Sequence, residues 1–303
     1  MNKLSYSFTP SIYISLKISM KQFIYSLFTC AGLLWAPMAN AQPKAHIGLT
    51  TAVNASFVLD KGLSADPRYN STMTYKFAPI GFALGIDFTP TFGLNLESIY
   101  AKQGQIYEII GQVNNVVKAV GERKISLEYL QIPLLLNFMS GGDARARASF
   151  MLGPQLSLLT NGLETYQQTQ KATFTVPQGS EPPAYADPGS YNPQTRTYTV
   201  SPQTQTLASS ESTDPLKQFK KAQFGVAAAL GLNIDLSNYI YLTTQIRGNY
   251  TISDMRNEDF VTQVQSGKSS DIFGRRGNLL VGVQLGLHVM FGGNRANNRM
   301  LVK

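Results

Sequence analysis

Apolar and polar residues alternate one by one along much of the chain. In residues 46–58, for example, Ile47 and Leu49 share one parity, while Gly48 and Thr50 share the other. A period of two residues is typical of a β-strand with one apolar and one polar face. The pattern predicts eight strands, over residues 46–58, 79–88, 92–102, 125–138, 147–158, 223–236, 240–252 and 278–291.

The strand at residues 125–138 is less regular than the others. Leu130 and the apolar residues after it set one parity, whereas Leu127 and Tyr129 set the other. An extra residue in a strand disrupts the pairing locally, so a β-bulge near Glu128 would reconcile the two sets. We therefore predict a bulge at this point.

The predicted connections alternate between short and long. Residues 89–91 and 237–238 are short links, and another short link begins at Met139. The long connections cover residues 59–74, 103–124, 161–218 and 253–276. In a meander, all short turns then lie at one end, as in outer-membrane barrels. We expect an all-β, eight-stranded antiparallel transmembrane β-barrel, an up-and-down meander with long extracellular loops and both termini in the periplasm.

The composition decides which face points outward. Only 15% of the residues are charged, against about 25% in an ordinary soluble domain. A soluble eight-stranded barrel points its apolar residues inward and needs a charged surface. Here the polar faces are rich in Gly, Ala, Ser, Thr, Asn and Gln, which suit a narrow lumen. Aromatic residues near strand ends suit interfacial girdles, namely Phe57, Phe88, Phe92, Tyr100, Phe138, Tyr250 and Phe291.

Residues 1–41 have the pattern of a secretory signal peptide. Lys21 precedes an apolar run from Phe23 to Trp35, and Ala39-Asn40-Ala41 fits a cleavage site. The signal is complete from Met20, which is an alternative start. A membrane-anchoring helix is disfavoured because the run is shorter than about 17 residues. We predict a barrel domain over 42–292 and a short periplasmic tail over 293–303.

The final predicted strand also carries an assembly pattern. Gln284-x-Gly286-x-x-Val289-x-Phe291 is similar to the terminal signal that the outer-membrane assembly machinery reads. We expect this machinery as a partner, with outer-membrane lipid and lipopolysaccharide around the barrel. The net charge of +8 is not clustered, so no nucleic-acid partner is expected.

One segment points to a family. Residues 127–136 read Leu-Glu-Tyr-Leu-Gln-Ile-Pro-Leu-Leu-Leu, which resembles the "YLxIPLLL" strand of the PorT-like outer-membrane β-barrel proteins of Bacteroidota. Residues 225–231, and Arg247 to Tyr250 followed by Asp254, resemble two further strands of that family. The resemblance implies an eight-stranded outer-membrane barrel, and some members serve type IX secretion. The length of residues 161–218 departs from the family pattern.

Six polar residues are predicted to face the lumen. They are Glu97, Arg147, Gln155, Gln245, Arg247 and Gln284. Because buried charges need partners, they are expected to form a charge-paired plug that fixes the strand register. A conducting pore is the alternative, although eight strands leave little free width. The pattern leaves open whether Glu128 joins this set or lies in the bulge.

Chemistry is otherwise sparse. His46 and His288 share the lumen parity near the periplasmic rim, so a two-histidine metal site is conceivable. We favour two hydrogen-bonded rim histidines and predict no metal, no cofactor and no catalytic residue. The sequence has no G-x-S-x-G motif, P-loop or zinc signature, and its single Cys lies in the signal peptide. We therefore predict that the protein is not an enzyme.

The long connections differ in composition. Residues 161–218 are rich in Gln, Thr, Ser and Pro, and are either a partner-binding element or a solvated loop. Within them, residues 173–176 and 195–200 alternate enough to extend the fifth and sixth strands as a hairpin-like projection. The connection at 253–276 is predicted to be a solvated cap of mixed charge, with Asp254, Arg256, Glu258, Asp259, Lys268, Asp271, Arg275 and Arg276.

These observations favour a structural or accessory protein of the outer membrane. The resemblance implies a role in protein secretion of the type IX kind, or in envelope assembly, with secretion-system or periplasmic partners. Two alternatives remain open: a small-solute channel of the OmpW type, and an OmpX-like adhesin that uses residues 161–218.

Overall fold

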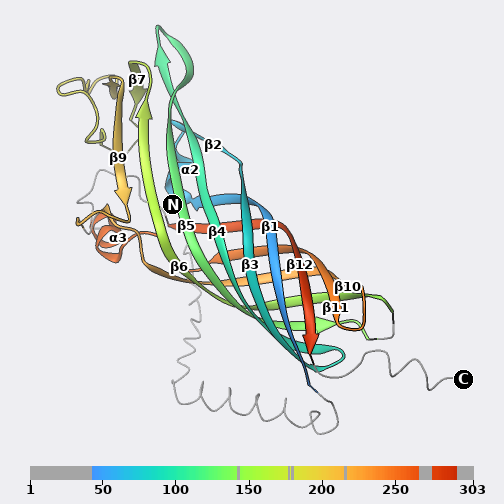
Figure 1. Ribbon diagram of the computed structural model, residues 1–303. Coiled ribbons are helices and arrows are strands. Elements are labelled where there is room, and N and C mark those ends of the chain that lie inside the picture. Colours follow the sequence, from blue (N-terminus) through green and yellow to red (C-terminus); the bar gives the residue numbers. More distant parts are fainter. Residues whose placement is uncertain are drawn as a thin grey trace, which may run out of the picture. The chain divides into compact units, whose positions relative to one another are not determined.

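The computed structural model describes residues 43–141, 144–176, 178, 181–214, 217–265 and 275–291 (Figure 1). The predicted signal peptide at 1–41 and the tail at 293–303 lie outside the described residues. Within the described ranges, no helix is long and apolar enough to cross a membrane.

Eight long strands close into an antiparallel barrel. They are β1 (Lys44–Asp60), β3 (Thr74–Thr89), β4 (Phe92–Val113), β5 (Val116–Met139), β6 (Ala146–Gln168), β10 (Ala222–Asp235), β11 (Ile240–Thr251) and β12 (Arg276–Phe291). Each pairs with its neighbour in this order, and the ladder from Ala45–Phe291 to Asp60–Arg276 joins β1 to β12. The predicted eight-stranded meander is confirmed. We call the end with the three short connections the turn end, and the opposite end the loop end.

The two faces of the barrel wall have opposite polarity. The outward side chains of Leu49, Phe82 and Leu230 are 57%, 57% and 64% exposed. The alternating inward positions carry mostly small or polar residues, with a few apolar ones such as Leu135 and Met151, because successive side chains of a strand point to opposite faces. The predicted apolar exterior and polar lumen are therefore both present. A closed ladder satisfies the backbone groups of the wall, as a hydrocarbon environment requires.

The bulge lies at the predicted level but on the neighbouring strand. The β5–β6 register shifts between Glu128 and Tyr129, whose partners are Asn161 and Leu159, so the extra residue is Thr160 of β6. From Arg123 to Met139, β5 itself keeps strict alternation, with its odd-numbered residues buried; its own register shift lies further out, at Val120. The change of parity that the sequence predicted within residues 125–138 was therefore wrong. The inward face of β5 instead changes from polar to apolar near the loop end.

The predicted loop at residues 103–124 is also wrong, because β4 and β5 continue as one ladder. Pairing extends to Val113 opposite Val116. The turn is formed by Asn114 and Asn115, whose φ angles are 51° and 66°. Two residues with positive φ are the requirement of a type I′ hairpin turn, and Asn tolerates this conformation. A long hairpin thus replaces the expected loop.

The other long connections also fold at the loop end. They form α2 (Lys61–Ala65), β2 (Tyr69–Thr72), β7 (Ala172–Thr175), β8 (Thr197–Val200), β9 (Gln203–Ser209) and α3 (Glu258–Gln265). The predicted hairpin exists as β7 and β8, but β7 joins β4 and β9 returns beside β6. It therefore does not extend the fifth and sixth strands as expected (Figure 1).

We call residues 61–74, 103–127, 161–176 and 181–214 the loop-end projection. It consists of these additions without α3, together with the outer ends of β4, β5 and β6. The projection has an apolar core of its own. Its buried members include Leu63, Tyr107, Ile109, Leu127, Tyr166, Phe174, Tyr198 and Val200. Burial of about 1.5–3 kcal/mol per large apolar side chain explains how a Gln- and Thr-rich segment becomes ordered. The Gln, Thr and Pro residues form the outside of this core.

Candidate functional site

The centre of the lumen is crossed by an ion pair. Arg247 of β11 contacts Glu97 of β4 through two hydrogen bonds, Nη1–Oε2 at 2.6 Å and Nη2–Oε1 at 2.7 Å. Gln284 of β12 donates to the same carboxylate at 3.0 Å. In the ring order, β4 and β11 are diametrically opposite. This bidentate pair therefore spans the barrel and gives each buried charge a partner.

The other predicted lumen residues, Gln155, Gln245 and Arg147, are also buried. Gln155 donates to Ser157 Oγ at 3.0 Å. Gln245 lies directly opposite Gln284 in the β11–β12 ladder. Arg147 lies at the turn end, where Nη1 is 3.4 Å from Pro90 O and Nη2 is 4.0 Å from Asp235 Oδ1. Three of the six residues thus meet through hydrogen bonds, and Arg147 and Gln155 have separate partners.

Two further levels of the lumen are bridged between distant strands. Asn249 of β11 donates to Gln131 of β5 at 3.1 Å. Closer to the loop end, Gln223 of β10 donates to the hydroxyl of Tyr129 at 2.8 Å. Asn278 of β12, the strand opposite β5 in the ring, donates to the same hydroxyl at 3.5 Å. Side chains from opposite sides of the lumen therefore meet at successive heights in the barrel. Glu128 is not among them: it lies on the outer face, 3.2 Å from Lys102 Nζ.

His46 and His288 meet at the turn end. Their ring centroids are 5.4 Å apart, and the His288 ring stacks on Tyr241 at 4.6 Å. His288 Nε2 is 3.2 Å from Thr243 Oγ1, and His46 Nε2 is 4.0 Å from Asp87 Oδ1. No group of three or more His, Cys, Asp or Glu able to hold a metal ion occurs in the described ranges. The pair packs as rings among lumen side chains.

A second buried ion cluster lies at the loop end of the lumen, and the sequence patterns did not reveal it. Arg276 contacts both Asp60 and Glu164, the latter at 2.8 Å. Arg123 donates to Glu164 at 2.7 Å. The side chains are 0–3% exposed. Asp60 also caps α2 by accepting from Gly62 N at 2.8 Å.

Each member of this cluster was placed in a different predicted loop. Asp60, Arg123, Glu164 and Arg276 come from the four long connections in turn. The sequence did contain a signal for two of these residues. Asp60 and Arg276 each lie two positions beyond the predicted strand and have the same parity as its lumen-facing residues. The cluster ties all four connections to the barrel mouth.

The connection at 253–276 is not simply solvated, as was predicted. Arg256 is buried and pairs with Asp254 at 3.0 Å, and Arg276 N donates to the same carboxylate at 3.0 Å. Burial alone would raise the pKa of Asp254, but its contacts with Arg256 and Arg276 N outweigh burial and lower the pKa. Only outer members such as Glu258, 2.7 Å from Lys220, are solvated. Lys268 and Asp271 lie outside the described residues.

A tyrosine cluster holds the segment between β7 and β8 against the projection. Tyr185 contacts the hydroxyl of Tyr69 at 2.9 Å, and its ring lies 4.3 Å from that of Tyr166. Arg68 donates to the Tyr198 hydroxyl at 2.6 Å. Burial raises the pKa of Tyr185 well above its ordinary value, so this hydroxyl stays neutral. The segment is packed onto the core.

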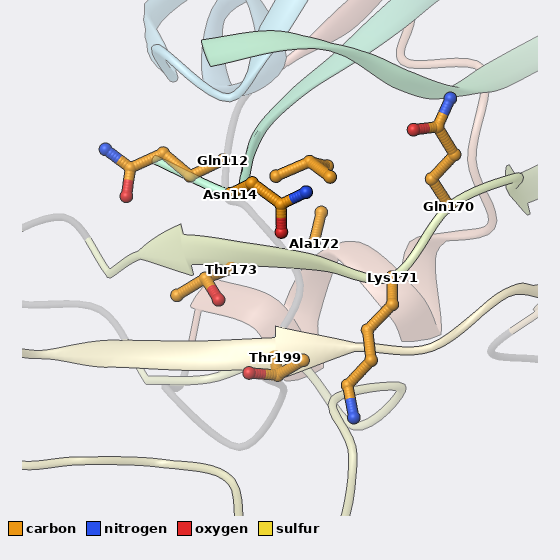
Figure 2. Close-up of a pocket in the computed structure, with 8 residues that line it drawn as sticks. Gln112, Asn114, Gln170, Lys171, Ala172, Thr173 and Thr199 are labelled. Carbon is orange, nitrogen blue, oxygen red and sulfur yellow. The ribbon is translucent and has the colours of Figure 1, made fainter. Parts of the chain in front are cut away.

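The tip of the projection carries an open groove of about 560 Å³, lined by both polar and apolar residues. Figure 2 shows Thr173 on β7 and Thr199 on β8, with Gln112 and Asn114 on the neighbouring hairpin. Gln170 and Lys171 line the same groove. Amide, hydroxyl and ammonium groups of this kind hydrogen-bond polar ligands and polypeptide backbones.

With this geometry established, the family can be identified. Residues 40–257 match the outer membrane protein β-barrel domain. The chain belongs to this family. An outer membrane protein β-barrel domain places the chain in the outer membrane, with the apolar exterior of the barrel toward lipid.

A comparison with the curated proteins found no match. Among solved structures, the chain is similar to the outer membrane protease OmpT from Escherichia coli, at 12% identity, 82% coverage of this chain, 97% of that chain and a TM-score of 0.36. Neisserial surface protein A has 10% sequence identity, with 82% of this chain and 97% of that chain covered and a TM-score of 0.35. OprG from Pseudomonas aeruginosa has 10% sequence identity, with 84% of this chain and 97% of that chain covered and a TM-score of 0.34. Scores this low assign no function to this outer membrane protein β-barrel domain.

Proposed function

We propose that this protein is a non-conducting outer-membrane barrel that acts by binding a protein partner through the loop-end projection. In this proposal the loop end faces the exterior of the cell, and both termini lie in the periplasm. The barrel wall contacts outer-membrane lipid and lipopolysaccharide, and residues Gln284–Phe291 are read by the assembly machinery.

The observation that carries the proposal is the contrast between lumen and projection. Lumen side chains from opposed strands meet at several heights, among them Glu97 with Arg247 and Tyr129 with Asn278. An eight-stranded barrel has room only for packed side chains. The projection, by contrast, has its own core and an open groove at its tip. Compact, long surface loops are frequently functional.

Two alternatives are less well supported by this geometry. A small-solute channel would need an open path through the bridged lumen. An enzyme would need its acid–base groups near the exterior, but both histidines lie among lumen side chains at the turn end.

The test removes the part of the projection between β6 and β9 while keeping the barrel closed. Glu164 of β6 pairs with Ala208 of β9. Replacing residues 165–207 by Asn-Gly therefore joins two paired positions through a hairpin turn and keeps Glu164 in its ion cluster. We expect the shortened chain to retain heat-modifiable migration on a gel. Crosslinking in intact cells is expected to capture a protein with the natural chain and not with the shortened one.

The resemblance to PorT-like proteins of Bacteroidota supports a more specific role. We propose that the bound partner belongs to a type IX-like secretion system or to envelope assembly. Deleting the gene is then expected to reduce the proteins found in the medium, with recovery from the natural chain and not from the shortened one. An unchanged set of secreted proteins rejects the export role and leaves the binding role standing.

A further inference from the structure

Strand β9 is an edge of the projection. It pairs with β6 from Leu163 to Gln168, and with no other strand in the described ranges. Figure 1 shows β9 beside the end of β6. The outer side of β8, by contrast, is covered, because Asp187 N donates to Thr199 O at 2.9 Å. An unpaired edge presents a row of backbone donors and acceptors.

The register shows which β9 residues present these groups. Thr169 N donates to Val120 O of β5 at 2.8 Å. In an antiparallel ladder, successive residues bond to alternate neighbours, so the even-numbered residues of β6 face β9. The β9 partners of Tyr166 and Gln168 are Gln205 and Gln203. The backbone N–H and C=O groups of Thr204 and Thr206 therefore point away from β6.

The regular part of this edge, Gln203–Thr206, carries neither charge nor proline, and the bulge of β9 lies beyond it, at Leu207. Natural edge strands carry charges, proline or a cover that prevents another strand from adding. Residues 203–209 read Gln-Thr-Gln-Thr-Leu-Ala-Ser, with no charge and no proline. The inner face is fixed, since Gln203 donates to Tyr185 O at 2.8 Å and Leu207 packs on the core. The edge is thus both accessible and held in an extended conformation.

We propose that β9 binds an extended, uncharged segment of a partner polypeptide by β-strand addition. This inference rests on the proposed role of the projection as a binding element. Thr204 and Thr206 supply the backbone hydrogen bonds, and the neutral β9 sequence favours a partner strand of β-branched and small polar residues.

A second copy of this chain is the wrong occupant on geometric grounds. Strand β9 runs antiparallel to β6, which crosses the barrel wall. Copies inserted in one membrane share a direction, so two β9 edges would run parallel. A two-fold axis along the strands would place each residue opposite its own copy. In a parallel pair, however, the hydrogen bonds are slanted, so a residue bonds to the neighbours of the residue opposite it. Two identical edges placed in this way therefore do not match. The added strand therefore comes from a different chain.

The test uses the full mature protein in detergent micelles. The probe is a dye-labelled peptide, Thr-Val-Thr-Val-Thr-Val-Thr, blocked at both ends and as long as β9, and binding is followed by fluorescence anisotropy. Thr204→Pro removes one outward N–H, which edge strands tolerate. Thr204→Ala keeps it. We expect saturable binding that Thr204→Pro weakens by about tenfold and Thr204→Ala leaves nearly unchanged. Backbone N-methylation at alternate peptide residues is expected to abolish binding.

Amide hydrogen exchange provides the second measurement. Without peptide, Thr204 and Thr206 are expected to exchange faster than Gln203 and Gln205, and the peptide should slow them. Protection of Thr204 and Thr206 in the free protein, an unbound peptide, or equal binding by Thr204→Pro each overturns the proposal. If Thr204→Pro still captures the cellular partner while the chain lacking 165–207 does not, strand addition fails and the proposed function stands.

Discussion

At the residue scale, buried charge distinguishes the lumen from the surface. Glu97 with Arg247, and Arg276 with Asp60 and Glu164, are almost fully buried. Lys220 with Glu258 is exposed, at 35% and 81% for the two side chains. Removing one partner of a buried pair leaves the other charge unpaired in a low-dielectric site. In an exposed pair, water solvates the remaining charge. The two kinds of pair should therefore respond differently to substitution.

Replacing Arg276 tests this difference. Arg276→Met leaves Asp60 and Glu164 without the guanidinium that they share, and we expect a loss of about 3–5 kcal/mol in the free energy of unfolding. Urea unfolding in detergent micelles measures it. The matched control, Lys220→Met, removes one partner of the exposed pair and is expected to leave the unfolding midpoint unchanged. Equal midpoints for the two variants would contradict a stabilising role for the buried cluster.

Asp254 provides a pH prediction. Its folded-state pKa is lowered from the ordinary value of 3.8. Its contribution to stability is therefore complete above the unfolded-state pKa, and is lost as the pH falls through the folded-state pKa. The backbone N–H groups of Arg256 and Arg276 both donate to this carboxylate. We therefore expect these two amides to exchange faster relative to other amides only when the pH falls below the ordinary pKa of 3.8. Asp254→Asn should remove this acid dependence, and acid dependence that persists in this variant would assign the effect to other carboxyl groups.

At the element scale, the alternation predicted every barrel strand but not where the long ones end. It works in the wall because one face meets lipid and the other meets a polar lumen. Beyond that band the inward residues, such as Leu127 and Tyr107, pack on an apolar core. The polarity of the inward face is then reversed, and the simple pattern reads as an irregularity or a loop. The Asn114–Asn115 turn was the missed local signal.

That turn makes a direct prediction. Asn114 and Asn115 have positive φ, a conformation that costs most L-residues about 1–2 kcal/mol. Asn115→Val should destabilise the end of the β4–β5 hairpin by this amount, seen as faster amide exchange in residues 108–120. Asn115→Gly should leave exchange equal or slower, because Gly adopts the conformation freely. Equal exchange in both variants would argue against the tight turn.

At the scale of the whole molecule, the candidate site was only partly predictable. Parity places Glu97, Arg247 and Gln284 in the lumen, because each lies mid-strand. It does not show that β4 and β11 are opposed, which depends on closure of the whole ring. It also does not show that Tyr185 contacts Tyr69, which lies 116 positions away. Contacts between distant loops leave no periodic trace in a sequence.

Conductance is the prediction that belongs to the whole barrel. In a planar bilayer, the purified protein is expected to give no single-channel steps. The double variant Glu97→Ala with Arg247→Ala should also stay silent, because Asn249 with Gln131 and Asn278 with Tyr129 still bridge the lumen. Steady steps from the natural protein would reject the non-conducting barrel and favour the solute channel.

The cluster of Asp60, Arg123, Glu164 and Arg276 divides the molecule into a part that must keep its register and a part that is free to vary. Each of the four predicted long connections contributes one charged residue to the cluster. Displacing any one of these residues therefore disturbs the other three. Segments above that level are released from this constraint. The barrel is therefore suited to serve as a display scaffold, in which foreign sequences replace the outer parts of these segments while the residues at the level of the cluster are kept.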